Sequence, residues 1–180
     1  MSAQPGGSLK ARRITGPSDP QLLRQARRVG RALGARGWRV VSAESCTAGW
    51  VTKVLTDVPG SSRWVEGGYV VYSNAAKIRD LHVPAAMLRR HGAVSDFTVL
   101  AMARGALRAT GADIAIAISG IAGPDGGTPQ KPVGTVWFGI AGRRAVRARA
   151  TVRFFRGDRE AVRRQSVALA LRLLLLSATP

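Results

Sequence analysis

The sequence predicts an α/β fold, a three-layer α/β/α sandwich around a mixed, mainly parallel sheet. Helical and strand patterns alternate through the first two thirds of the chain, which is typical of parallel strands joined by crossover helices. Residues 112–118 form a near-continuous apolar run, as expected for a strand covered on both faces. Two further strand patterns, at 133–141 and 145–155, follow each other directly and predict a hairpin. With 180 residues, the chain is long enough for one such domain.

The first predicted element of this domain is a helix that follows a basic tail. Residues 1–19 hold glycine, serine, proline and basic residues without periodicity, so we expect a disordered tail and a domain over residues 20–180. The helix is expected to begin at Asp19, and apolar residues at helical spacing continue it until a glycine-rich segment. Residues 38–42 then predict the first strand.

A turn, a helix and a second strand come next. Residues 44–49 predict the turn, and the helix after it extends to about Thr56. The Pro-Gly segment at 57–62 predicts another turn, and residues 67–72 predict the second strand.

Helical segments separate this strand from the buried one. Asn74 is a candidate N-cap for a short helix over residues 75–81, and Pro84 interrupts the chain before another helical turn. Ser95 is expected to cap a longer helix that ends near Thr110.

The chain ends with a loop, the hairpin and a final helix. Residues 119–132 are rich in glycine and proline and predict the loop between the buried strand and the hairpin. Asp158 is expected to cap the last helix, which runs from Arg159 to about Leu176.

Composition restricts the class of function. The formal charge is +18, but the arginines are spread along the chain and no nucleic-acid motif is present, so we expect an anionic small substrate and no specific nucleic acid. No apolar run is long enough to cross a membrane, and no secretory signal begins the chain. The single cysteine, Cys46, excludes an internal disulfide and is consistent with a cytoplasmic location.

The segment from Glu44 to Gly49 is the first candidate site. It places Ser45, Cys46 and Thr47 between a strand and a helix start, where free backbone N–H groups favour negative charge. One of these side chains could act as a nucleophile while the N–H groups stabilise an oxyanion. Alternatively, Ser45 or Thr47 is an ordinary N-cap and Cys46 is a small buried residue.

The segment from Tyr72 to Lys77 is the second candidate site. Lys77 lies one turn into the helix that follows a strand, and a partly desolvated lysine can serve as a base toward a serine hydroxyl. Alternatively, it is a solvated helix residue. His82 and His91 have no acidic residue or cysteine at metal-ligand spacing, so neither a metal nor another cofactor is expected.

Two later segments are candidates for binding an anion. In the loop, glycines allow the backbone to approach a ligand, and we select Ser119, Gly120, Ala122 and Gly123. Alternatively, the loop is only a long connection. Arg159 at a helix start could bind a phosphate with both guanidinium nitrogens, or it is solvated beside the Asp158 cap.

Seven motifs in one order resemble the CinA C-terminal domain family, from about residue 21 to residue 176. They are Ala-Glu-Ser-Cys-Thr-x-Gly at 43–49, Asp-Val-Pro-Gly-Ser-Ser at 57–62, Tyr-Ser-Asn-x-x-Lys at 72–77, Gly-Ala-Val-Ser at 92–95, Gly-Ile-Ala-Gly-Pro at 120–124, Gly-Thr-Pro-x-Lys-Pro-Val-Gly-Thr at 127–135 and Gly-Asp-Arg at 157–159. The resemblance implies an α/β/α amidohydrolase that converts nicotinamide mononucleotide and water to nicotinate mononucleotide and ammonia. It also implies a stand-alone domain, no metal, and a homodimer or higher homo-oligomer.

Two residues depart from the family pattern. Ala48 stands where the family usually has glycine, and it adds a methyl group to a tight turn. Ser119 stands where the family usually has threonine, and it keeps the hydroxyl. Neither change removes a candidate catalytic group.

The resulting hypothesis is covalent acyl transfer. Ser45 attacks the carboxamide carbon with Lys77 as base, directly or through Tyr72, and backbone N–H groups of residues 46–49 or Gly120 hold the oxyanion. Lys131, Arg159 and the glycine-rich loop are candidates for the nucleotide phosphate, and Glu44 or Tyr72 for the cationic ring. Two alternatives stay open: a catalytically weak binding module linked to competence or DNA damage, and an amidase for another nucleotide.

Overall fold

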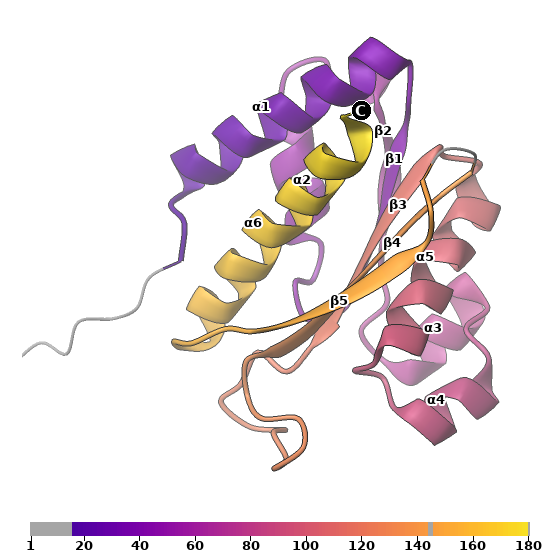
Figure 1. Ribbon diagram of the computed structural model, residues 1–180, viewed down its shortest axis with the longest axis vertical. Helices are drawn as coiled ribbons and strands as arrows, with labels where there is room; N and C mark the ends of the chain where they lie inside the picture. The colour runs from indigo at the N-terminus through magenta and orange to yellow at the C-terminus, as the bar shows by residue number, and fades with distance from the viewer. Residues whose placement is uncertain (1–15, 144–145, 180) are drawn as a thin grey trace, which may run out of the picture.

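Five strands form one mixed sheet in the order β2-β1-β3-β4-β5 (Figure 1). The computed structural model describes residues 16–143 and 146–179. β1 pairs in parallel with β2 and β3, whereas β4 is antiparallel to both β3 and β5. Four strands therefore run in one direction and β4 in the other, which confirms the predicted mixed, mainly parallel sheet. The strands are β1 (Val40–Glu44), β2 (Val65–Val70), β3 (Ile114–Gly120), β4 (Thr135–Gly142) and β5 (Arg149–Phe154).

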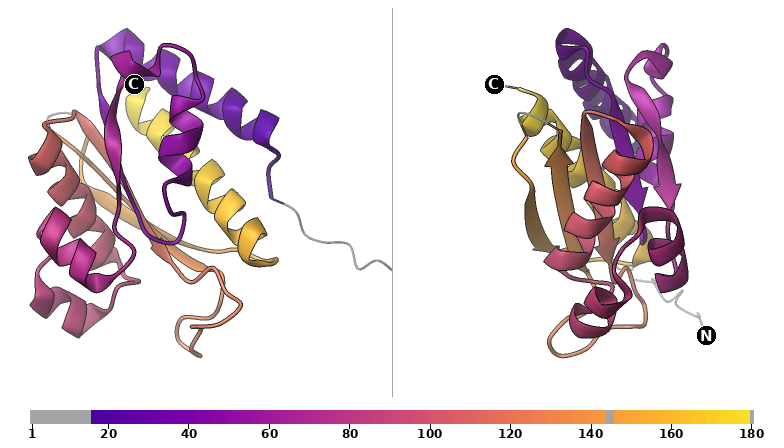
Figure 2. Two further views of the ribbon diagram at one scale, coloured as in Figure 1. Left: turned by 180° about the vertical axis from the view of Figure 1, so that it is seen from behind. Right: turned by 90° about the vertical axis from the view of Figure 1, so that its right-hand side faces the viewer.

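Helices cover both faces of this sheet and make the predicted three layers. One face carries α1, α2 and α6, and the other carries α3, α4 and α5 (Figure 2). The helices are α1 (Asp19–Arg36), α2 (Trp50–Thr56), α3 (Asn74–Leu81), α4 (Ala85–His91), α5 (Asp96–Thr110) and α6 (Arg159–Ala178), with a short 3₁₀ helix η1 (Ser61–Arg63). None of the helices in the described ranges is both long and apolar enough to span a bilayer.

The buried strand β3 shows how its sequence distributes residues between the two faces. Ile114, Ile116 and Ile118 pack into the core beneath α1, α2 and α6, whereas Ala115 and Ala117 face the core beneath α5. Successive side chains of a strand point to opposite faces, so the Ile-Ala alternation places small residues under α5. This helix can therefore approach the sheet closely.

Helix caps follow the sequence at two of the three predicted positions. Ser95 and Asp158 accept hydrogen bonds from the first turns of α5 and α6, as predicted. The prediction for α3 was wrong by one residue, because Ser73 and not Asn74 accepts the backbone N–H of Ala76 at 3.0 Å. The first predicted helix is confirmed as α1.

Strand boundaries differ more. β1 begins at Val40 and not at residue 38, because the Trp38 N–H still closes the end of α1 on the Leu33 carbonyl. Glu44, predicted in the turn, is the last residue of β1, and β2 ends at Val70. β5 begins at Arg149, later than the predicted residue 145. Residues 144–145 and residues 1–15 of the predicted tail lie outside the described residues.

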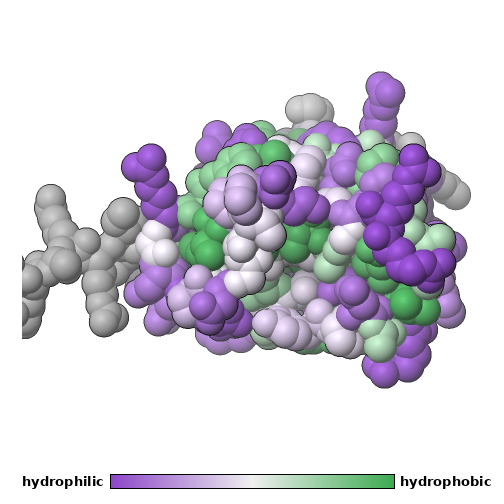
Figure 3. Space-filling view, turned by 90° about the horizontal axis from the view of Figure 1, so that it is seen from below, coloured by the Kyte–Doolittle hydropathy of each residue, from purple (hydrophilic) through white to green (hydrophobic). Residues whose placement is uncertain are grey.

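The parallel strands bring three chain segments to one edge of the sheet. Glu44 at the end of β1 lies in register with Val70 of β2 and with Ile118 of β3. The residues that follow each strand therefore meet at the carboxyl edge, where open α/β sheets bind ligands. The view from below displays this end of the molecule, with apolar areas between hydrophilic ones (Figure 3).

Candidate active site

A serine and a lysine from different elements meet at the carboxyl edge of the sheet. Ser45 directly follows β1, and its N–H donates to the Ile118 carbonyl of β3. Lys77 belongs to α3, and its Nζ lies 3.2 Å from Ser45 Oγ. Lys77 is only 1% exposed and Ser45 only 7%, so both residues are buried where they meet. The structure thus brings together the nucleophile and the base selected from the sequence.

The surroundings of Lys77 determine which group carries the proton. Nζ also contacts the carbonyl oxygens of Val71 at 2.8 Å and Tyr72 at 2.9 Å. Carbonyl oxygens only accept hydrogen bonds, so these two contacts occupy two N–H groups of the amine. When Lys77 is neutral, its lone pair is left for the hydroxyl proton of Ser45. Burial lowers the pKa of Lys77 from 10.5 to about 8, which makes the neutral amine accessible near neutral pH.

Tyr72 contributes its backbone carbonyl to this arrangement. Its side chain is 61% exposed, and its carbonyl accepts from Lys77 Nζ. Because Nζ reaches Ser45 Oγ directly, the arrangement needs no relay through the phenol.

Glu44 is fully buried and caps α2. Its carboxylate accepts the backbone N–H groups of Val51 and Thr52 and the hydroxyls of Thr52 and Ser42, at 2.9–3.0 Å. A carboxylate at a helix N-terminus satisfies free N–H groups and complements the helix dipole. The sequence predicted that free N–H groups at the start of this helix would favour a negative charge, and the Glu44 carboxylate supplies that charge.

The turn before α2 offers backbone donors. Within the described residues, the N–H groups of Cys46, Thr47 and Gly49 have no hydrogen-bond acceptor on another residue. They lie directly after Ser45 in the chain, so they are available to an oxyanion formed on its substrate. The Thr47 hydroxyl is buried and also without a partner in that part of the chain.

Cys46 is packed into the core beneath α1, α2 and α6. Burial, together with the nearby Glu44 carboxylate, raises the pKa of its thiol to about 12. A thiol with this pKa stays protonated at neutral pH and is a poor nucleophile. This favours Ser45 as the attacking group.

Ala48 has a strained backbone conformation in this turn. It is exposed and has a φ of 51°, in the left-handed region that disfavours a Cβ atom, and Gly49 follows with a φ of 86°. We expect Ala48→Gly to raise the free energy of unfolding by about 0.5–1 kcal/mol, measured by urea denaturation. Ala35→Gly, at an exposed α1 residue, is the control and should lower stability by up to about 1 kcal/mol. A lower free energy of unfolding in Ala48→Gly would show that the Ala48 backbone is not strained.

The end of β3 and the loop after it are bound to the end of α4 and to the segment that follows it. Ser119 Oγ donates to the Ala93 carbonyl at 2.8 Å, and Lys131 Nζ donates to the carbonyls of His91 and Val94. The loop was predicted to begin at Ser119, but Ser119 and Gly120 are the last two residues of β3, because both pair with β4. A Cβ at Gly120 would come within 2.8 Å of the Thr135 carbonyl, and Ala122 in the loop is buried in the core. In this structure the Lys131 ammonium is therefore used to hold the loop.

Two arginines of α6 approach the turn over residues 45–49, which follows β1. Arg159 donates to the Gly123 carbonyl at 2.7 Å, and Arg163, one turn later, donates to the Thr47 carbonyl at 3.0 Å. Both guanidinium groups act to lower the pKa of the Cys46 thiol, which places their charges near this turn. Sequence reasoning selected Arg159 and missed Arg163. The signal was present, because residues four apart share one helix face.

The described part of the chain holds no group of three His, Cys, Asp or Glu side chains arranged for a metal ion. The residues brought together at the carboxyl edge are instead a hydroxyl, a partly neutral amine, backbone N–H groups and two guanidinium groups. These are the components of acyl transfer through a serine.

The chain is similar to proteins of one family along most of its length. The model of the CinA C-terminal domain matches residues 23–177. Nicotinamide-nucleotide amidohydrolase PncC of Escherichia coli K12 is 54% identical over 159 residues, which cover 87% of this chain and 94% of that protein. The protein of the same name from Pseudomonas putida is 53% identical over 86% of this chain and 95% of its own length. The crystal structure of competence/damage inducible protein CihA from Agrobacterium tumefaciens superposes with a TM-score of 0.85 at 38% identity, over 91% of this chain and 98% of that one.

Proposed function

The chain belongs to the CinA C-terminal domain family, and we infer from this membership that it is a nicotinamide-nucleotide amidohydrolase. Its reaction converts nicotinamide mononucleotide and water to nicotinate mononucleotide and ammonia. The observation that carries this proposal is the 3.2 Å contact between Lys77 Nζ and Ser45 Oγ, because it supplies an activated nucleophile for an amide carbon. An abandoned site in a pure binding module would have no need to keep this buried pair.

In the proposed mechanism, the first half-reaction forms an ester on Ser45. Neutral Lys77 takes the hydroxyl proton as Ser45 Oγ bonds to the carboxamide carbon, and the carbonyl oxygen becomes an oxyanion. The protonated Lys77 then gives this proton to the amide nitrogen, and the C–N bond breaks to release ammonia. In the second half, Lys77 removes a proton from water, hydroxide attacks the ester, and the proton returns to Ser45 Oγ as nicotinate mononucleotide leaves.

Charges around the catalytic turn match the substrate. Nicotinamide mononucleotide carries a cationic ring and an anionic phosphate. The Glu44 carboxylate raises the pKa of the Cys46 thiol, whereas the guanidinium groups of Arg159 and Arg163 lower it, so charges of both signs lie near this turn. In the proposal, the arginines attract the phosphate and the buried carboxylate favours the cationic ring. The N–H groups of residues 46–49 receive the oxyanion.

Ammonia release from nicotinamide mononucleotide tests this function. We expect saturable turnover with this substrate and much weaker turnover with free nicotinamide, which lacks the phosphate that the arginines attract. A coupled assay for ammonia measures both rates on the purified full chain. If other nucleotide amides are hydrolysed and nicotinamide mononucleotide is not, the proposed substrate is wrong although the chemistry stands.

We also propose that the protein assembles into a homodimer or higher homo-oligomer, as its family resemblance implies. The exposed Phe154 on edge strand β5 and the exposed Leu176 on α6 are consistent with contact through this side of the molecule. Light scattering coupled to size-exclusion chromatography measures the mass in solution.

A further inference from the structure

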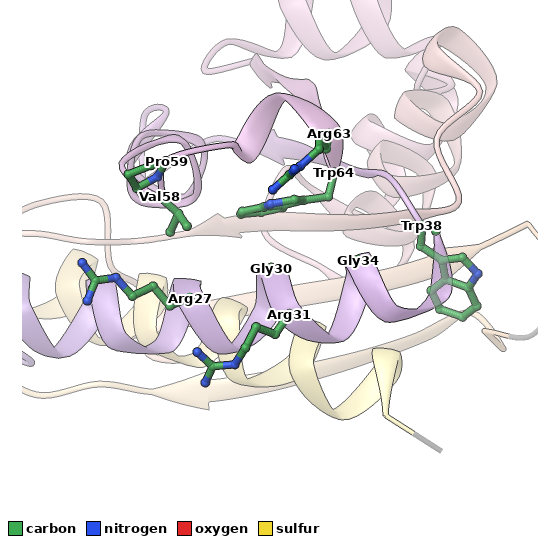
Figure 4. A pocket seen from close by; sticks show the side chains of 10 residues that line it. Arg27, Gly30, Arg31, Gly34, Trp38, Val58, Pro59, Arg63 and Trp64 are labelled. Carbon is green, nitrogen blue, oxygen red and sulfur yellow. The ribbon is translucent and has the colours of Figure 1, made fainter.

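A hollow lies at the opposite end of the sheet from Ser45 and Lys77. It is open to solvent on one side and has a volume of about 580 Å³, between α1 and the segment that joins α2 to β2 (Figure 4). Ligand sites in proteins are typically about 300–1,000 Å³, so this hollow is large enough for one small molecule. The residues that line it are Arg27, Gly30, Arg31, Gly34, Gly37, Trp38, Val58, Pro59, Arg63 and Trp64.

The hollow is strongly basic. Arg27 and Arg31 are four residues apart on α1, and Arg63 reaches it from η1 (Figure 4). Within the described residues, none of these three exposed side chains forms an ion pair or a hydrogen bond, whereas Arg39 pairs with Glu66, and Arg164 with Asp19 and Glu160. Three uncompensated guanidinium groups around one cavity favour a ligand with a phosphate group.

Two tryptophans add aromatic surface to the same hollow. Trp64 is 6% exposed and packs against α1 at Gly30, where a Cβ would come within 2.7 Å of its ring. Trp38 is half-buried at the other end of the hollow, after the end of α1 (Figure 4), and the Arg36 guanidinium lies over its ring, 4.6 Å from the ring centroid. Only 4 of the 180 residues are tryptophan, and two of them line this cavity. Aromatic faces bind planar bases by stacking.

Gly34 lines the hollow and leaves room for a larger side chain. It lies inside α1, where glycine is destabilising relative to alanine. A Cβ at this residue would meet nothing within 4 Å, so no packing contact in the fold explains the glycine. The absence of a side chain here leaves space along the helix between Arg31 and Trp38.

We propose that this hollow is a second binding site, and that it takes a free nucleotide. The phosphate lies among Arg27, Arg31 and Arg63, and the base lies against the exposed part of Trp38. The volume suits one nucleotide better than a strand of nucleic acid, which would need a longer continuous groove. Nothing in the proposed amidase reaction uses these residues.

The position of the hollow separates it from the catalytic pair. Trp38 precedes β1 and Trp64 precedes β2, so the hollow is at the amino ends of the strands, while Ser45 follows β1. The five residues of β1 span about 16 Å at roughly 3.3 Å per residue. Binding in the hollow can therefore be altered without touching the catalytic residues.

Titration with adenosine 5′-monophosphate tests the proposal on the full chain. We expect saturable quenching of tryptophan fluorescence, with binding at least about tenfold tighter than that of inorganic phosphate or adenosine alone, because each supplies only half of the contacts. Nicotinamide mononucleotide and nicotinate mononucleotide are left out, because each carries a phosphate and a planar ring and would compete for the hollow; the variants separate binding in the hollow from binding at the catalytic site. Arg27→Ala/Arg31→Ala should weaken binding by about tenfold or more. Its rate of ammonia release, measured without adenosine 5′-monophosphate, should stay at the wild-type value.

Gly34→Leu is the second variant, because it fills the hollow without removing a charge. It replaces glycine with a better helix former, so the fold should survive, and binding should be lost. The matched control is Arg104→Ala/Arg108→Ala on α5, which removes two exposed arginines of the same spacing beside another hollow that has no aromatic lining. This control should change binding less than twofold.

Three results would overturn the proposal. One is the absence of saturable binding of adenosine 5′-monophosphate, and another is an equal loss of binding in the α5 control. The third concerns a single-stranded oligothymidylate of about ten nucleotides. If it binds tightly through Arg27 and Arg31, with a steep dependence on salt, while adenosine 5′-monophosphate does not bind, the hollow is a nucleic-acid site. Ammonia release is measured separately, so failure of this site and failure of the amidase function are distinguished.

Discussion

Ser45→Ala is expected to lower kcat for ammonia release by at least about 10³-fold, because it removes the atom that bonds to the carboxamide carbon. The hydroxyl is small and its backbone N–H keeps the bond to Ile118, so the fold should be retained. Rates from the ammonia assay and far-UV circular dichroism measure the two effects. Mass spectrometry of wild-type protein quenched during turnover should detect the nicotinoyl nucleotide ester on the peptide that contains Ser45.

Cys46→Ala is the matched control, since it alters the neighbouring nucleophile candidate. The Cys46 thiol has a pKa of about 12 and lies in the core, so kcat should remain within about threefold of the wild-type value. If Cys46→Ala is inactive while Ser45→Ala still turns over, the roles assigned to these two residues are reversed.

Lys77→Met is expected to lower kcat by about 10²–10⁴-fold, because Ser45 then loses its base. The wild-type enzyme should show kcat/KM rising about tenfold per pH unit below pH 8 and levelling above it, as the pKa of Lys77 near 8 requires. Lys77→Arg keeps the positive charge but cannot release its proton, so it should be as inactive as the methionine variant. An active Lys77→Arg enzyme would exclude the proton-transfer role.

A stability measurement tests the same lysine without reference to activity. Burial lowers the Lys77 pKa from 10.5 to about 8, so between these values the unfolded chain binds more protons than the folded one. The free energy of unfolding of the wild type should therefore rise between about pH 8 and pH 10.5, by up to about 3 kcal/mol relative to Lys77→Met. Urea denaturation at several pH values measures this difference. Parallel curves for the two proteins would mean that the lysine is not desolvated.

Local patterns were sufficient to predict most of the fold. Apolar periodicity and the capping residues Ser95 and Asp158 located their helices, and the apolar run ending at Ile118 identified the buried strand. Strand ends were predicted less well because distant groups set them. The Trp38 N–H is taken by the end of α1, and the carbonyls of Val71 and Tyr72 are taken by Lys77 and not by a neighbouring strand.

The site was predicted as a set of residues and not as a set of contacts. Strand-end reasoning selected Ser45 and Lys77, which the sheet brings together. It could not foresee that Glu44 would cap α2, or that Lys131 would hold the segment at His91. These contacts join residues that only the folded chain brings together, and hydrophobic spacing carries no information about them.

The two carbonyls that hold Lys77 have a consequence for how the enzyme loses activity. They belong to the short link between β2 and α3, so the amine that we propose as the base also holds its own loop in place. α3 has only 8 residues, and such a short helix is marginal without its tertiary contacts. If the hydrogen bonds of Lys77 to these two carbonyls break, the amine moves away from Ser45 while the sheet and the longer helices remain folded. Mild heating or low concentrations of urea would then abolish activity by opening this link, before the core unfolds.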